Sequence, residues 1–241
     1  MTGIPLLCLP FAGAGASYYS PWRDRDERVQ VRPLQLPGRE NRLEEEPCTE
    51  VRAAVDDLVR NLPPAVTGGT AVAVFGHSLG AVLAFELVRR LETATGVVVR
   101  HLFVSGSPGP WSVRENGASG LTDEAFLRRV REFAGYEHPA LADEELRDLI
   151  LPAMRADVQM HESYRAAPDA RVAAPVTVLR GAEDALVAED EAAQWRAATL
   201  GDFRLMNLPG GHMYLTDQVD AILGLAGETL AEAAPVSGGA R

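Results

Sequence analysis

Short apolar runs alternate with helix-like runs along most of this chain, and that alternation restricts the fold more than any other feature. Six runs are nearly continuous in apolar and β-branched residues, as expected of strands buried on both faces: 4–9, 29–36, 71–75, 97–104, 176–179 and 203–208. Helix-like runs lie between them at 50–61, 81–92, 190–198 and 213–233. Strands that alternate with helices form parallel sheets with helical crossovers, so the pattern predicts an α/β fold whose central sheet is mostly parallel.

Residues 121–166 break the alternation, because they contain no strand-like run. The sequence predicts consecutive helices at 123–134, 143–151 and 152–164, with Pro152 either starting a new helix or kinking the previous one. Residues recur at helical spacing on one stripe: Leu146, Leu149, Ile150, Met154, Val158 and His161. One interpretation is a helical excursion that packs on the core. The interpretation we favour is a lid above the carboxyl edge of the sheet, where open parallel sheets bind ligands.

The length of 241 residues fits one α/β domain over residues 1–241, with a helical lid subdomain at about 121–166. The small, polar residues at about 234–241 predict a flexible tail. No apolar run approaches the roughly 20 residues that span a bilayer, and the amino terminus lacks the pattern of a secretory signal. We therefore expect a cytoplasmic protein, and a monomer.

The charge and the ligand-type residues exclude some classes of function. A net charge of −11 argues against nucleic acid as a partner, because its phosphates would be repelled. Cys8 and Cys48 are expected to be unpaired thiols in a reducing compartment. The five histidines are scattered without zinc-ligand spacing, so the sequence predicts neither a metal site nor a cofactor.

The stretch Gly76-His77-Ser78-Leu79-Gly80 stands where a strand ends and a helix begins. A chain that turns this sharply forces Ser78 toward sparsely populated backbone angles, and the two glycines remove the clashes. The turn lifts the Ser78 hydroxyl clear of the sheet and places the Leu79 amide at a helix amino terminus. Strand before and helix after favour a nucleophilic serine over a merely structural turn.

A serine nucleophile needs a base, and His212 is the candidate in the best position. It follows the 203–208 strand through Pro209-Gly210-Gly211, a loop at the carboxyl edge. The other four histidines fit structural or solvent-exposed roles. His77 should point away from its neighbour Ser78, His101 lies in a strand, His138 adjoins Pro139, and His161 lies on the apolar stripe.

Asp184 is the candidate to orient that base, because it comes just past the 176–179 strand. Glu183 and Asp190 are the alternatives. The loop after the 97–104 strand, Ser105-Gly106-Ser107-Pro108-Gly109-Pro110, offers no carboxylate. The resulting chain order of Ser78, Asp184 and His212 is that of α/β-hydrolases, and we predict that fold, with helices flanking the sheet and a helical lid insertion.

A second donor to an oxyanion is expected from the small-residue loop after the first strand, Leu9-Pro10-Phe11-Ala12-Gly13-Ala14-Gly15. The backbone amide of Ala12 is the first candidate and that of Phe11 the second, each paired with the Leu79 amide. The alternative is a plain glycine-rich turn. The loop lacks the third glycine and the acidic partner of a dinucleotide-binding motif.

Taken together, these segments resemble type II thioesterases, the stand-alone editing hydrolases of polyketide and nonribosomal peptide synthesis. The resemblance spans nearly the whole chain. Its most informative segments are Leu36-Pro37-Gly38-Arg39-Glu40 with Arg42, and Leu151-Pro152-Ala153-Met154-Arg155-Ala156-Asp157. The sequence departs from the family at Phe11, where histidine is common, and at Leu79, where methionine is common. Both positions act through backbone amides, so the departures bear on pocket shape.

The resemblance implies a serine thioesterase with Ser78 as nucleophile, His212 as base and Asp184 as its orienter. It implies an oxyanion hole formed by the Ala12 and Leu79 amides. The substrates would be acyl groups on the phosphopantetheine arm of acyl- or peptidyl-carrier proteins, removed to unblock stalled or mis-primed synthases. Carrier proteins are acidic, so docking on this acidic chain would need a basic patch, and the candidates are Arg128, Arg129 and Arg131, or Arg23 and Arg25.

Three other functions are alternatives to a thioesterase. A general carboxylesterase or lipase would need the same three side chains, and an acyltransferase or cyclase would divert the same acyl-enzyme from water. A non-catalytic scaffold of a synthase would not need them, so their presence argues against that alternative.

Overall fold

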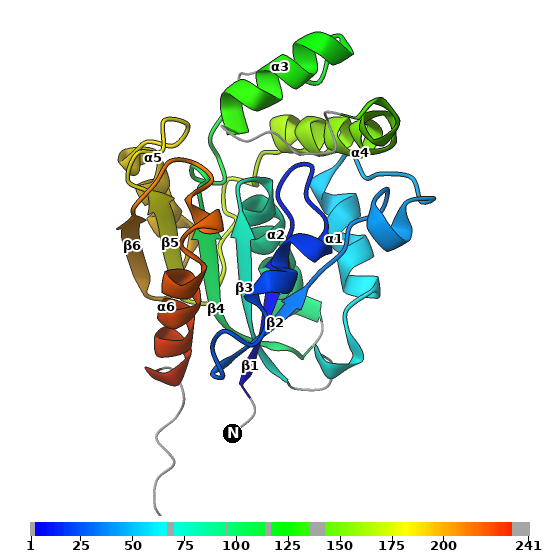
Figure 1. The fold of residues 1–241 in the computed structure, drawn as a ribbon. Coiled ribbons are helices and arrows are strands. Elements are labelled where there is room, and N and C mark those ends of the chain that lie inside the picture. Colours follow the sequence, from blue (N-terminus) through cyan, green and yellow to red (C-terminus); the bar gives the residue numbers. More distant parts are fainter. Residues whose placement is uncertain (1–2, 67–69, 95, 114–116, 135–142, 233–241) are drawn as a thin grey trace, which may run out of the picture.

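A six-stranded, wholly parallel sheet forms the centre of the molecule, with strand order β2-β1-β3-β4-β5-β6 (Figure 1). The computed structural model describes residues 3–66, 70–94, 96–113, 117–134 and 143–232. The strands are β1 (Ile4–Leu9), β2 (Val29–Pro33), β3 (Ala71–His77), β4 (Val98–Ser105), β5 (Val176–Gly181) and β6 (Phe203–Leu208). The predicted α/β class and parallel sheet are confirmed.

Alternate residues of each inner strand point to opposite faces of the sheet, and each face packs on its own helices. Leu7 and Leu9 of β1 face the cluster that holds α1 (Val51–Arg60) and α2 (Leu79–Ala94). Leu6 and Cys8 face the other cluster, to which α6 (Val219–Glu232) contributes. Burial on both faces explains why the sequence shows nearly continuous apolar runs here instead of alternation.

Several predicted boundaries shift in the structure. The second strand ends at Pro33 and not at residue 36, although the amide of Leu34 still donates to the carbonyl of Cys8 at 2.9 Å. The predicted helix at 190–198 is a short α5 (Glu189–Ala193) followed by a 3-10 turn at Gln194–Ala198. The predicted helix at 213–233 begins as α6 only at Val219, after a separate 3-10 turn at Tyr214–Thr216.

The described residues between β4 and β5 include two helices, which lie beyond the carboxyl ends of the strands (Figure 1). Helix α3 (Asp123–Ala134) and helix α4 (Glu144–Ser163) share a small apolar cluster that includes Phe126, Leu151 and Met154. Residues 135–142 between them, His138 included, lie outside the described residues.

The prediction of two helices at 143–151 and 152–164 is wrong, because α4 runs through Pro152 as one helix. Proline removes a single intrahelical hydrogen bond, and burial of Leu151, Ala153 and Met154 on either side stabilises the helix across that gap. The predicted stripe also divides. Met154 is buried, whereas Leu146 and Leu149 are about half exposed.

The predicted tail at 234–241 lies outside the described residues. Across the residues that the structure covers, every helix is too short or too polar to cross a membrane.

Candidate active site

Ser78 is the single residue between the end of β3 and the start of α2. It has φ = 53°, the left-handed region that costs energy for any residue with a side chain. Its amide donates to the carbonyl of Ser105 at 2.8 Å, and its carbonyl accepts from the amide of Ala81 at 3.0 Å. These two bonds hold the strained residue in place at the carboxyl edge of the sheet.

The glycines on either side are needed because strand and helix pass so closely. A Cβ atom on Gly76 would overlap the carbonyl oxygen of Gly80. One on Gly80 would lie 2.6 Å from the carbonyl oxygen of Leu9 in β1. Only glycine fits at these two positions, as the sequence predicted.

His212 and Asp184 meet at the carboxyl ends of two neighbouring strands. Nδ1 of His212, on the loop after β6, lies 2.9 Å from Oδ2 of Asp184, on the loop after β5. The Asp184 side chain is buried, and its Oδ1 accepts from the amides of Leu186 at 2.8 Å and Val187 at 3.3 Å. Burial raises the pKa of Asp184, but the hydrogen bonds from His212 and the two amides outweigh it, so the pKa is lower than usual. The carboxylate is therefore ionised at neutral pH and holds the ring in one orientation.

The alternative carboxylates do not take that position. Glu183 is exposed, and Asp190 accepts from the amide of Glu191 at 3.0 Å on the exposed start of α5. Of the three candidate acids, Asp184 is the one in contact with His212.

Two other histidines are buried inside the fold. His101 in β4 lies with Nε2 at 2.8 Å from Oγ1 of Thr177. The ring of His77 packs 4.8 Å from that of His212, centroid to centroid. From its place on the apolar stripe, His161 was expected to be a packed core histidine; this is wrong, because it lines the cavity and is only partly buried.

Ser78 and His212 line one cavity of about 370 Å³ at the carboxyl edge. Most of the wall is apolar and comes from the loop after β1, from α3 and α4, and from the loops after β5 and β6. The apolar side chains include those of Phe11, Ala12, Ala14, Val130, Met154, Val158, Leu186, Val187 and Met213. A small-molecule site of this size, with a few converging polar groups, suits an apolar ligand.

Ala12 and Leu79, the two predicted amide donors, lie near this cavity. Ala12 lines it, and Leu79 is the first residue of α2, directly after Ser78. The Ala12 loop is closed by a hydrogen bond from the amide of Ala14 to the carbonyl of Phe11 at 2.9 Å. The Phe11 ring packs edge-on against Tyr18 and His77, so this side chain forms part of the apolar wall.

Sequence reasoning gave no role to Arg39 and Asp157, which form a buried ion pair beside the Ala12 loop. The available signal was a charged residue inside each of the two segments most typical of the family. It also missed the hydrogen bonds that link His77, Ser105 and Tyr214 behind His212. No group of three potential metal ligands occurs in the part of the chain that the structure describes.

Comparisons with known proteins agree with this architecture. The thioesterase domain family model matches residues 4–229. Thioesterase PikA5 from Streptomyces venezuelae is 39% identical over 219 residues, which cover 90% of this chain and 77% of that protein.

Two solved structures are similar over almost their whole length. The type II thioesterase BorB from the borrelidin biosynthetic cluster has a TM-score of 0.85 and 38% identity, covering 95% of this chain and 93% of BorB. ClbQ from the colibactin NRPS/PKS pathway has a TM-score of 0.87 and 28% identity, covering 96% and 98%. The chain therefore belongs to the thioesterase domain family, and it is a thioester hydrolase of α/β-hydrolase fold that is similar to type II thioesterases of polyketide and nonribosomal peptide synthesis.

Proposed function

We propose that Ser78, His212 and Asp184 form the catalytic triad of this thioesterase. The observation that carries the proposal is the 2.9 Å contact between His212 and Asp184 at the mouth of the cavity that Ser78 also lines. The Asp184 carboxylate fixes the imidazole with its Nδ1 hydrogen toward the carboxylate, which leaves Nε2 to act on the serine. The left-handed φ of Ser78 supports the same role, because strained residues of this kind gather at active sites.

In the proposed reaction, Oγ of Ser78 attacks the thioester carbonyl while His212 takes its proton. The negative charge on the carbonyl oxygen is stabilised by the amides of Ala12 and Leu79. The carbon–sulfur bond then breaks, and the thiolate receives the proton from His212. Water, deprotonated by His212, attacks the acyl-serine. The bond from the acyl carbon to Oγ then breaks, His212 returns the proton to Ser78, and the carboxylic acid is released.

The proposed substrates are acyl groups carried on the phosphopantetheine arm of acyl- or peptidyl-carrier proteins. BorB comes from the borrelidin biosynthetic cluster, and ClbQ comes from the colibactin NRPS/PKS pathway. The apolar cavity of about 370 Å³ accepts a modest acyl chain better than a bulky, polar polyketide. We propose that the enzyme removes stalled or mis-primed acyl groups, with residues 121–166 acting as a lid that limits what enters.

Docking of the carrier is proposed at the basic residues of α3, namely Arg128, Arg129 and Arg131. Of these, Arg128 and Arg131 are exposed. In the alternative patch of Arg23 and Arg25, Arg25 pairs with Asp220 at 3.0 Å. Action as a cytoplasmic monomer, without nucleic acid or membrane, belongs to the same proposal.

Mass spectrometry of acyl-carrier proteins tests this function. Purified carriers loaded with acetyl, butyryl, hexanoyl and longer chains are incubated with the enzyme and with Ser78→Ala. We expect loss of the acyl mass with the wild type and none with the variant. Equal turnover by both proteins would refute the proposed triad. A higher kcat/KM for matched oxygen esters than for thioesters would favour a general esterase.

A further inference from the structure

A buried ion pair joins the loop after β2 to helix α4, directly behind the Ala12 loop. Nη1 and Nη2 of Arg39 donate to Oδ2 and Oδ1 of Asp157 at 2.7 and 2.8 Å. Asp157 is fully buried and Arg39 is 8% exposed. A two-pronged pair of this kind fixes both position and orientation, whereas a lone surface pair would not.

The same two side chains hold the backbone of the Ala12 loop. Oδ2 of Asp157 accepts from the amide of Gly13 at 2.8 Å, and Nη1 of Arg39 donates to the carbonyl of Ala14 at 3.0 Å. We call Arg39, Asp157 and these two backbone groups the clasp. The peptide group that the clasp holds at Gly13 follows Ala12 immediately, so a shift at Gly13 turns the Ala12 amide as well.

The loop also lies against α4 through packing. Gly13 has φ = +80°, and a Cβ atom there would lie 2.8 Å from the terminal methyl of Met154. Met154 and Asp157 are one turn apart on α4, and Met154 lines the cavity. One stretch of α4 thus covers the acyl cavity and anchors the loop that carries the proposed oxyanion donor.

We infer that the clasp is a positioning unit. Through it, Arg39 and Asp157 hold the Ala12 amide in the position that donates to the oxyanion, and that position depends on how α4 packs against the loop. This inference rests on the proposed function, because it assigns the Ala12 amide to the oxyanion. Neither side chain touches the substrate. Their effect is on the transition state, because an amide displaced by a fraction of an ångström loses most of its stabilisation of the oxyanion.

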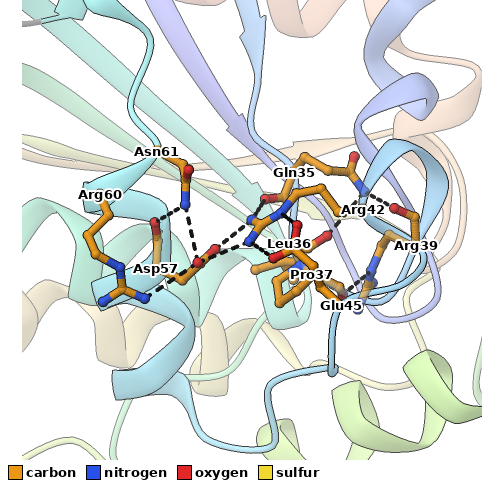
Figure 2. Close-up of polar contacts among 9 residues, drawn as sticks. All are labelled: Gln35, Leu36, Pro37, Arg39, Arg42, Glu45, Asp57, Arg60 and Asn61. Atoms are coloured by element: carbon orange, nitrogen blue, oxygen red, sulfur yellow. Dashed lines mark hydrogen bonds and ion pairs between the residues drawn. The ribbon is translucent and has the colours of Figure 1, made fainter.

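The chain carries its own matched control. Arg42, three residues after Arg39, forms a similar pair with Asp57 of α1, at 2.6 and 3.0 Å (Figure 2). Asp57 is also buried, at 9% exposure, and it bonds Asn61 as well. The Arg42–Asp57 pair stabilises the same loop after β2, but neither residue lines the cavity.

The experiment compares Asp157→Asn, Arg39→Lys and the control Asp57→Asn. Asparagine at 157 removes the charge and turns a donor toward the guanidinium or the Gly13 amide, and lysine at 39 cannot reach both carboxylate oxygens. Each variant is assayed with an acyl-pantetheine thioester for kcat and KM, and for melting temperature. Each is also assayed for inhibition by a trifluoromethyl ketone analogue of that thioester, to which Ser78 adds and forms a tetrahedral oxyanion.

We expect Asp157→Asn and Arg39→Lys to lower kcat by about 10- to 100-fold with little change in KM, and to raise the inhibition constant of the ketone by a similar factor. Asp57→Asn should lower the melting temperature to a comparable extent while kcat and the inhibition constant stay near wild type. If Asp157→Asn does not fold, the kcat and inhibition constant of Arg39→Lys alone test whether the clasp positions the Ala12 amide.

Two results would overturn the inference separately from the proposed function. If Asp157→Asn or Arg39→Lys keeps the wild-type kcat and inhibition constant, the clasp has only a structural role. The same conclusion follows if the kcat and inhibition constant of these variants equal those of Asp57→Asn. Turnover that survives Ser78→Ala would instead remove the triad, and with it the oxyanion on which the clasp acts.

Discussion

The imidazole of His77 packs against that of His212, with 4.8 Å between ring centroids and 49° between the planes. His77 in turn shares a buried hydrogen-bond chain, in which Oγ of Ser105 lies 2.8 Å from its Nδ1 and 2.6 Å from the hydroxyl of Tyr214. The chain joins the residue before Ser78 to the second residue after His212. Burial, and secondarily the neighbouring His212, holds the pKa of His77 well below 6.5, so the ring facing His212 is neutral.

Ser105→Ala is expected to destabilise the fold by about 2 kcal/mol and to lower kcat, because it leaves both His77 and Tyr214 without their buried partner. Tyr214→Phe removes one bond and should cost about 1 kcal/mol. Urea unfolding and steady-state kinetics of both variants measure these effects. The prediction is contradicted if Ser105→Ala lowers the free energy of unfolding less than Tyr214→Phe does.

Asp184→Asn is expected to lower kcat/KM by about 100- to 10,000-fold, since an amide in that position favours the wrong tautomer of His212. The neighbouring, exposed Glu183 provides the control, and Glu183→Gln should stay close to wild type. Both variants are assayed with the same acyl-pantetheine thioester. Equal losses would mean that the loop tolerates no change of charge, whichever carboxylate is altered.

Gly76→Ala is expected to destabilise the protein by about 3 kcal/mol, because the added methyl group overlaps the Gly80 carbonyl at the turn around Ser78. Gly224→Ala, inside α6 with no atom within 4 Å of the new methyl, should instead stabilise by about 0.5 to 1 kcal/mol. Chemical denaturation compares the two. A Gly76→Ala protein of wild-type stability and activity would show that the turn can open.

Stability should fall as the pH drops from 6.5 toward 4, partly through His101. Burial lowers the pKa of this strand residue to about 4, against the weaker opposing effect of Asp202. The unfolded chain therefore takes up a proton near pH 6.5 that the folded chain refuses until about pH 4. His101 therefore accounts for about 2 kcal/mol of the unfolding free energy lost between pH 7 and pH 5.

Unfolding free energies of the wild type and His101→Gln at pH 7 and pH 5 measure that share. The variant should show the shallower pH dependence, with a residual slope from buried His77, which acts in the same direction. Parallel pH profiles would exclude His101 as a source.

Reversing the charge of α3, with Arg128→Glu and Arg129→Glu, should raise KM several-fold for an acyl-carrier protein and leave KM for acyl-pantetheine unchanged. The reason is that an acidic carrier meets the patch whereas the small thioester does not. Titration of KM against salt for both substrates gives a second measurement. Equal effects on the two substrates would remove α3 as the docking surface.

The sequence predicted best where a local pattern has only one physical outcome. Strands β1 and β6 have the predicted bounds, because each apolar run is closed by a turn residue, Pro10 and Pro209. The turn at Ser78 could be predicted for the same reason, since two glycines so close to a serine suit few other conformations.

Where the outcome depends on partners distant in sequence, the sequence could not decide. Pro152 allowed either a new helix or a kink in the old one, and apolar contacts to α3 hold Glu144–Ser163 together as one helix. Arg39 and Asp157 are separated by 118 positions, and nothing near either residue indicates the other. Asp184 and Glu183 are neighbours in the loop after β5, so which of them contacts His212 depends on which side chain points inward.

The order of strands in the sheet has a consequence for synthesis of the chain. Because β5 and β6 pair outside β4, the amino-terminal two-thirds can assemble four strands while the free edge of β4 is still uncovered. Asp184 and His212 follow those last two strands, so a nascent chain forms the turn at Ser78 before it contains the two residues proposed to activate that serine. A chain that ends after residue 166 would expose the unpaired edge of β4, which favours aggregation, and would lack both Asp184 and His212.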